Sequence, residues 1–121
     1  MDEDTLLMSM LLDFFGELLT EKQREYFDLY YNEDLTLSEI AVKAGISKQG
    51  VHDMIARAKK TLLGLEEKTN VVKRWRETQA RLALAESAAR ELLRLSEGNG
   101  EAAELARSLV LTLEGIDDYG I

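Results

Sequence analysis

The sequence predicts an all-α protein in which a helix-turn-helix domain is followed by a long helix and a C-terminal helical hairpin. Three observations support this fold class. The 121 residues include no proline, which favours long uninterrupted helices. Apolar residues recur at spacings of three and four along the chain, and no segment shows the two-residue alternation of a strand. Residues 36–60 have the pattern of two short helices joined by a tight turn.

The first two predicted helices precede this motif. The first runs over about residues 5–19, where the apolar side chains form one helical stripe. That stripe consists of Leu6, Leu7, Met10, Leu11, Phe14 and Leu18. Thr20 can cap a second helix that extends to about Tyr31. The aromatic residues Tyr26, Phe27, Tyr30 and Tyr31 form its stripe, and residues 32–35 form the linker that ends it.

The third and fourth predicted helices form the motif itself, at residues 36–44 and from residue 47 to about residue 63. Thr36 and Glu39 have the spacing of a capping box, which would start the third helix. Gly45 tolerates the positive φ of the turn, and the small Ala41 lets the two helices approach. Ser47 can cap the fourth helix. The remaining apolar positions of the motif are Ile40, Ala44, Ile46, Val51 and Ile55.

Two further helices complete the prediction. Gly64 leaves open whether the fourth helix stops or only bends. A fifth helix over about residues 71–96 shows a heptad seam, made of Val71, Trp75, Thr78, Leu82, Ala85, Ala89 and Leu92. After a turn, a sixth helix over about residues 102–113 would face inward with Leu105, Ala106, Leu109 and Leu113. We therefore expect a helix-turn-helix domain at residues 1–66 and a hairpin at residues 67–121, which would brace the motif or make a homodimer.

Composition excludes several classes of protein. The absence of cysteine rules out a disulfide framework and a zinc finger, and fits a cytoplasmic location. No apolar run reaches the roughly 18 residues that a membrane span needs, so no membrane association is expected. No glycine-rich phosphate loop, nucleophile elbow or carboxylate pair is present, so the sequence indicates neither an enzyme nor a cofactor.

The charge is unevenly distributed along the chain. The net charge is −8 overall. Residues 47–78 hold eight basic and four acidic residues, a net charge of +4, whereas residues 1–46 carry −8 and residues 79–121 carry −4. A polyanion would therefore be attracted to the fourth helix and the segment just beyond it, and repelled elsewhere.

The outer face of the fourth helix carries the candidate site. Such a face can enter the major groove of a duplex, where Lys and Gln read base edges and basic residues hold phosphates. The candidate residues are Lys48, Gln49, His52, Asp53, Arg57, Lys59 and Lys60. The alternative is a solvated polar face on a protein-binding domain, and Asp53 favours it because a carboxylate repels phosphate. His52 is the only histidine, and a surface position suits it better than a catalytic or metal-binding role.

The stretch from Leu18 to Glu77 resembles the YlxM family of small bacterial proteins. The tyrosines Tyr26, Tyr30 and Tyr31 precede NEDLTLSEIA at residues 32–41, and this combination carries the resemblance. The motif also resembles region 4 of bacterial sigma factors, whose pattern would place nucleic-acid contacts at Lys48, Gln49, His52 and Asp53. Sigma factors tend to carry arginines at these positions, and this chain does not.

The resemblance to the YlxM family implies a regulatory role in the signal recognition particle pathway of bacteria. The resulting hypothesis is a nucleic-acid-binding protein whose target is duplex DNA or the RNA of the particle. The alternative hypothesis is a protein-interaction module that modulates the GTPases of the pathway without binding nucleic acid.

Overall fold

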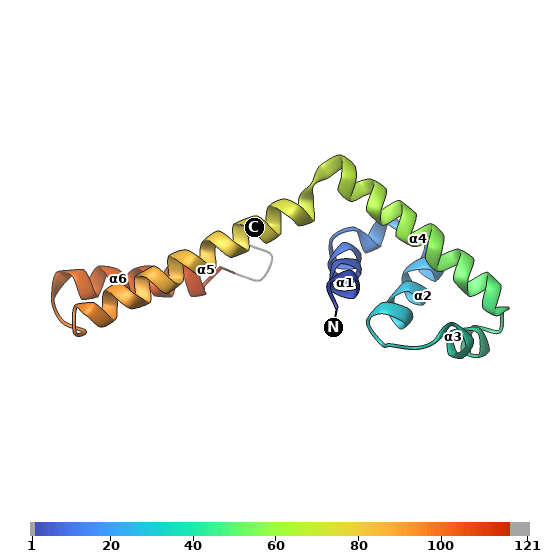
Figure 1. Ribbon diagram of the computed structural model, residues 1–121, viewed down its shortest axis with the longest axis horizontal. Coiled ribbons are helices and arrows are strands. Elements are labelled where there is room, and N and C mark those ends of the chain that lie inside the picture. Colours follow the sequence, from blue (N-terminus) through green and yellow to red (C-terminus); the bar gives the residue numbers. More distant parts are fainter. Residues whose placement is uncertain (1, 117–121) are drawn as a thin grey trace. The chain divides into compact units, whose positions relative to one another are not determined.

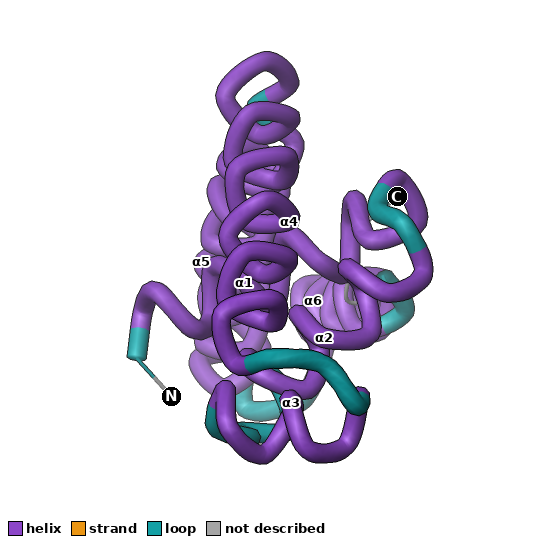
Figure 2. Tube along the Cα trace, turned by 90° about the vertical axis from the view of Figure 1, so that its right-hand side faces the viewer, coloured by secondary structure: helices purple, strands orange, loops and turns teal. Residues whose placement is uncertain are grey.

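Helices account for most of residues 2–116, the part of the chain that the computed structural model describes (Figures 1 and 2). In chain order they are α1 (Glu3–Phe15), the 3-10 turn η1 (Gly16–Leu18), α2 (Glu21–Tyr31), α3 (Leu37–Ala44), α4 (Lys48–Thr69), α5 (Val71–Leu95) and α6 (Gly100–Glu114). Residues 2–116 contain no strand, and the predicted all-α class is confirmed. The chain divides into two compact units, Met1–Val72 and Lys73–Ile121.

Side-chain caps begin the first three helices. Asp2 accepts a hydrogen bond of 2.8 Å from the backbone N–H of Thr5 at the start of α1. Thr20 and Thr36 each form a reciprocal capping box, at the starts of α2 and α3. In the second box, the Thr36 hydroxyl accepts from the backbone N–H of Glu39 and the Glu39 carboxylate accepts from that of Thr36, both at 3.1 Å. These caps satisfy N–H groups that the helices leave without partners.

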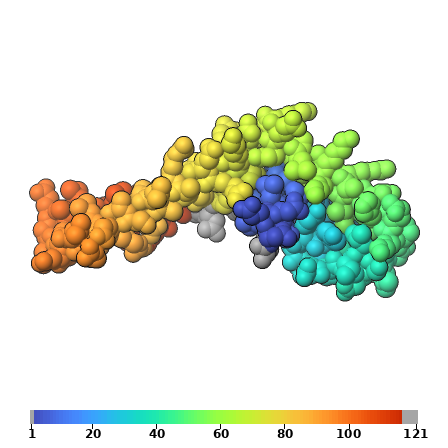
Figure 3. Space-filling model, in the orientation of Figure 1, coloured from blue at the N-terminus to red at the C-terminus, as the bar shows by residue number. Residues whose placement is uncertain are grey.

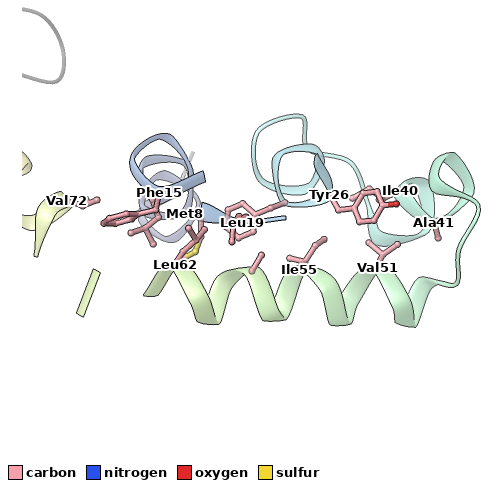
Figure 4. Packing of buried hydrophobic residues seen from close by; sticks show 13 residues of the cluster. Met8, Phe15, Leu19, Tyr26, Ile40, Ala41, Val51, Ile55, Leu62 and Val72 are labelled. Atoms are coloured by element: carbon pink, nitrogen blue, oxygen red, sulfur yellow. The ribbon is translucent and has the colours of Figure 1, made fainter. Parts of the chain in front are cut away.

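The core of the first unit lies along one side of α4. Val51, Ile55 and Leu62 point from α4 towards α1, α2 and α3 (Figure 4). They are spaced by four and seven residues, so they share one helical face. Phe27 and Leu11 are fully buried against this face. Burial of each such side chain contributes about 1.5–3 kcal/mol, so the position of α4 is fixed by packing over several turns.

The fourth helix neither stops nor breaks at Gly64 but continues to Thr69. Asn70 then adopts a left-handed conformation, with φ 54°, and its N–H donates to the carbonyl of Glu66 at 2.8 Å. The side chain of Glu66 accepts a hydrogen bond of 2.9 Å from the N–H of Val72, at the first turn of α5. One residue therefore separates α4 from α5, and Asn70 takes the place that glycine often holds at a helix end.

The second unit is an α5–α6 hairpin whose seam differs from the predicted one. Ala89 of α5 and Ala103, Ala106 and Val110 of α6 are buried. The buried or half-buried positions of α5 are Val71, Val72, Trp75, Gln79, Leu82, Glu86, Ala89 and Leu93, of which Val71 and Val72 pack on the core of the first unit. They keep the predicted Val71, Trp75, Leu82 and Ala89, but the prediction was wrong for a larger set of residues, which are exposed: Thr78, Ala85, Leu92, Leu105 and Leu109.

The physical reason for this error lies in Gln79 and Glu86. Both are polar, so the sequence pattern favoured Thr78 and Ala85 at these turns. Long polar side chains can lie along a seam with their polar ends in water. Glu86 does so and accepts hydrogen bonds of 3.1 and 2.9 Å from Arg90. Ala85 and Leu92 are apolar yet exposed, so α6 covers only part of the apolar side of α5.

Candidate nucleic-acid interface

A left-handed glycine joins α3 to α4. Gly45 has φ 72° and ψ 29°, and its N–H donates to the carbonyl of Ala41 at 2.9 Å. Ala41 and Val51 are buried where the two helices cross, as the motif predicts. Ile46 is an exception, because it is exposed rather than part of the core. Glycine is favoured at this φ because other residues meet steric strain there.

The start of α4 explains the glycine in its first turn. The hydroxyl of Ser47 accepts a hydrogen bond of 3.0 Å from the N–H of Gly50. A Cβ atom on Gly50 would lie 3.1 Å from that same hydroxyl oxygen. A side chain at position 50 would therefore crowd the cap, so the cap gives Gly50 a structural role.

All seven candidate residues lie on α4, beginning at its first residue. Six are exposed, namely Lys48, Gln49, His52, Asp53, Arg57 and Lys60, and Lys59 is half-buried. Side chains of α4 stand out from the surface of the first unit (Figure 3). The 3.6-residue period separates them into two rows and one flanking residue. Lys48, His52 and Lys59 form the row nearer α2, Gln49, Asp53 and Lys60 form the outermost row, and Arg57 lies on the other flank.

Gln49, a candidate base reader, and His52 both contact Asp53, the acidic residue of the outermost row. The side-chain amide of Gln49 donates a hydrogen bond of 2.8 Å to Asp53 Oδ1, and His52 Nδ1 lies 3.4 Å from the same oxygen. The hydrogen bond from Gln49 is the main cause that lowers the pKa of Asp53 below its ordinary value, and the one from His52 adds to it. Asp53 is therefore ionised at neutral pH. Its carboxylate contacts the side chains of both Gln49 and His52, so neither is free of an intramolecular contact.

The row nearer α2 borders a surface hollow that also holds acidic residues. Lys48 and Lys59 both line this hollow. Its acidic members are Asp2, Asp4 and Asp34. A phosphate that approached these lysines from this side would meet three carboxylates. Sequence reasoning missed the arrangement because residues 2 and 48 are far apart along the chain, and no local pattern links them.

Two tyrosines of α2 line the same hollow. Tyr30 and Tyr31 make an edge-to-face contact, with ring centroids 5.0 Å apart and planes at 87°. Burial is the main cause that raises the pKa of Tyr31, and the charge of Asp4 raises it further. Both tyrosines belong to the predicted aromatic stripe of this helix, and Tyr30 is partly exposed and lies beside His52 and Lys59. The hollow therefore has an aromatic wall next to the candidate residues.

Two further features concern residues 2–116, the part of the chain that the structure describes. There, no three acidic or histidine side chains are grouped closely enough to hold a metal ion. None of the helices in that part is long and apolar enough to cross a membrane.

Comparisons with known proteins identify relatives over nearly the whole chain. The model of the UPF0122 family, described as YlxM/p13-like helix-turn-helix proteins, matches residues 2–98. A UPF0122 protein of Thermoanaerobacter sp. strain X514 is 38% identical over 117 residues, which cover 97% of this chain and 99% of the relative. A UPF0122 protein of Clostridium kluyveri is 50% identical over 70 residues, 58% of this chain and 63% of the relative. No solved structure matches. The chain belongs to the UPF0122 family of YlxM/p13-like helix-turn-helix proteins.

Proposed function

We propose that this protein binds nucleic acid through the exposed side of α4 and regulates the bacterial signal recognition particle pathway from the cytoplasm. One observation carries the nucleic-acid part of the proposal. A helix-turn-helix core holds α4 with four basic residues on or beside its exposed rows, in a unit that is otherwise acidic. Attraction of a polyanion is therefore concentrated on this helix. The helix-turn-helix description of the family supports the same reading.

In this proposal some of the candidate residues contact phosphates and others contact base edges. Arg57 and Lys60 lie away from the acidic hollow, so they would hold phosphates. Lys48 and Gln49, in the first turn, would reach base edges, as the N-terminal residues of a recognition helix do. Asp53 would have to release Gln49 for this contact, or would accept a hydrogen bond from a base itself. Duplex DNA and the RNA of the particle both offer the phosphates that this arrangement requires.

The alternative function is a protein-interaction module that modulates the GTPases of the pathway without nucleic acid. The acidic side of the hollow favours this alternative, because Asp2, Asp4 and Asp34 lie on the same surface as Lys48 and Lys59. Mixed charges of this kind suit a protein surface of complementary charge better than a phosphate backbone.

Fluorescence anisotropy separates these two functions. Labelled duplex DNA and particle RNA would be titrated with wild-type protein and with Lys48→Ala/Arg57→Ala, over a series of salt concentrations. We expect log K to fall linearly with log salt, and the slope to become shallower in the variant because fewer counterions are released. Lys22→Ala/Arg24→Ala, which removes one lysine and one arginine from α2, should keep the wild-type slope. The absence of saturable binding to either nucleic acid would contradict the proposal.

The C-terminal hairpin has a proposed role that is separate from nucleic-acid binding by α4. From the sequence it would brace the motif or pair two copies of the protein, and we propose that it makes a homodimer. Dimers of helix-turn-helix proteins present two recognition helices to one target. This arrangement would offset the small number of basic residues on each α4.

A further inference from the structure

The α5–α6 hairpin has two flanks, one on each side of its seam. The chain runs in opposite directions along α5 and α6. Viewed from one end of the hairpin, successive residues therefore turn clockwise around one helix and anticlockwise around the other. Residues that directly follow a seam position on either helix therefore fall on one flank, and residues that directly precede a seam position fall on the other.

The first flank is polar and joined by hydrogen bonds. Arg90, which follows the seam residue Ala89, forms an ion pair with Glu114, which follows Leu113. Arg107, which follows Ala106, donates a hydrogen bond of 2.8 Å from Nη2 to the carbonyl of Gly98. The Arg90–Glu114 pair directly shows that residues following the seam on the two helices meet on one side.

The second flank is apolar and exposed. We call it the leucine face. Its charged members, Arg74 and Arg81, lie at the end far from the turn, and the other members listed here are exposed and uncharged: Ala85, Ala88, Leu92, Leu95, Ala102, Leu105, Leu109, Thr112 and Ile116. Leu105 is 67% exposed and Leu95 is 64% exposed. These side chains offer no charge that could hold a phosphate, so an apolar partner suits this face best.

The distribution of large and small side chains makes the leucine face complementary to a second copy. On α5, Leu92 and Leu95 lie nearest the turn and Ala85 and Ala88 lie further from it, whereas α6 carries Leu105 and Leu109 along its length. Two hairpins laid against each other in opposite directions would seat the α5 leucines of each copy on the α5 alanines of the other. Two hairpins that run in the same direction would instead place the α5 leucines of the two copies against each other and leave their α5 alanines out of contact.

Charge at the two ends of the face favours the same arrangement. Arg81 lies one turn before Ala85, at the alanine end of the leucine face. Glu97 and Glu101 lie at the opposite end, beside the turn between α5 and α6. Opposed hairpins bring Arg81 of each copy towards these carboxylates of the other. Parallel hairpins would bring the two Arg81 side chains together, which is unfavourable.

We propose that two copies of the protein pair through their leucine faces, with the hairpins in opposite directions, to form a four-helix bundle. The contact is isologous, as expected for a two-fold dimer. This inference rests on the homodimer part of the proposed function and specifies its surface.

Sedimentation equilibrium of the full chain tests the surface, using a matched pair of variants. Leu105 and Leu111 are almost equally exposed, at 67% and 65%, but Leu111 lies on the polar flank. Leu105→Glu would bury an unpaired charge in the dimer, so we expect its dissociation constant to rise at least about tenfold. Leu111→Glu should leave the dissociation constant within about twofold of wild type, since surface substitutions usually have small effects. A wild-type protein that stays monomeric at about 100 μM, or equal effects of the two variants, would overturn the proposal.

Charge reversal tests the direction of pairing. Arg81→Glu and Glu101→Arg should each weaken the dimer, and the two together should restore it, since they recreate an attractive pair between copies. A double variant weaker than both single variants would overturn the opposed arrangement. These measurements contain no nucleic acid, so their outcome is independent of whether α4 binds it.

Discussion

At the scale of single residues, Asp53 is the one acidic side chain among the seven candidate residues. Asp53→Asn removes its charge and can keep a hydrogen bond with Gln49. We expect this variant to bind duplex DNA or particle RNA roughly three- to tenfold more tightly at low salt, because one repulsion of about 1 kcal/mol is lost. The difference should shrink as salt rises, because the charge is exposed and screened. Equal affinities of wild type and variant at low salt would place Asp53 outside the interface.

Gly45 tests the geometry of the turn. Its φ of 72° is unfavourable for a β-branched residue, although a Cβ atom would meet no heavy atom within 4 Å. Gly45→Val should therefore lower the free energy of unfolding through backbone strain alone, by about 1–2 kcal/mol. The melting temperature should fall by about 5 °C. Gly45→Asn, which tolerates this conformation better, should lose less, and an unchanged melting temperature in Gly45→Val would contradict the role of the turn.

At the scale of elements, α4 contains two glycines with different roles. Gly64 lies in the helix interior, with open space around its Cβ position, so Gly64→Ala should raise the free energy of unfolding by about 0.5–1 kcal/mol. Gly50→Ala should gain little or nothing, because the new methyl group would crowd the hydroxyl of Ser47. Chemical denaturation of the two variants gives both free energies. A similar gain in both would show that the Ser47 cap does not constrain position 50.

How far the sequence predicts each element depends on how local its causes are. The capping box of Thr36 and the turn at Gly45 involve residues close in sequence, and the structure confirms both. The end of α4 could not be placed, because packing on both sides of Gly64, by Leu62 and Leu65, outweighs the local cost of the glycine. The α5 seam was misplaced because two apolar registers overlap, and only contact with α6 selects between them. The acidic hollow beside α4 escaped prediction because its residues come together only in the folded chain.

At the scale of the whole molecule, charge limits the strength of nucleic-acid binding. The net charge is −8, while α4 offers Lys48, Arg57, Lys59 and Lys60 to a polyanion. Neutralising about four phosphates per copy gives an expected slope of about −3.6 for log K against log salt on duplex DNA. Anisotropy titrations at several salt concentrations measure this slope. A slope near zero would show that phosphate contacts do not drive binding.

The proposed function requires that the exposed side of α4 is the surface that binds nucleic acid. Its most direct test is an NMR titration of the ¹⁵N-labelled full chain with duplex DNA and, separately, with particle RNA. We expect the largest amide shifts at the start and exposed rows of α4, at Lys48, Gln49, Asp53 and Lys60, with one of the two ligands. Amides of the polar flank of the hairpin, such as Arg90, should change little. Shifts confined to residues outside α4, or no saturable shifts with either ligand, would contradict the claim.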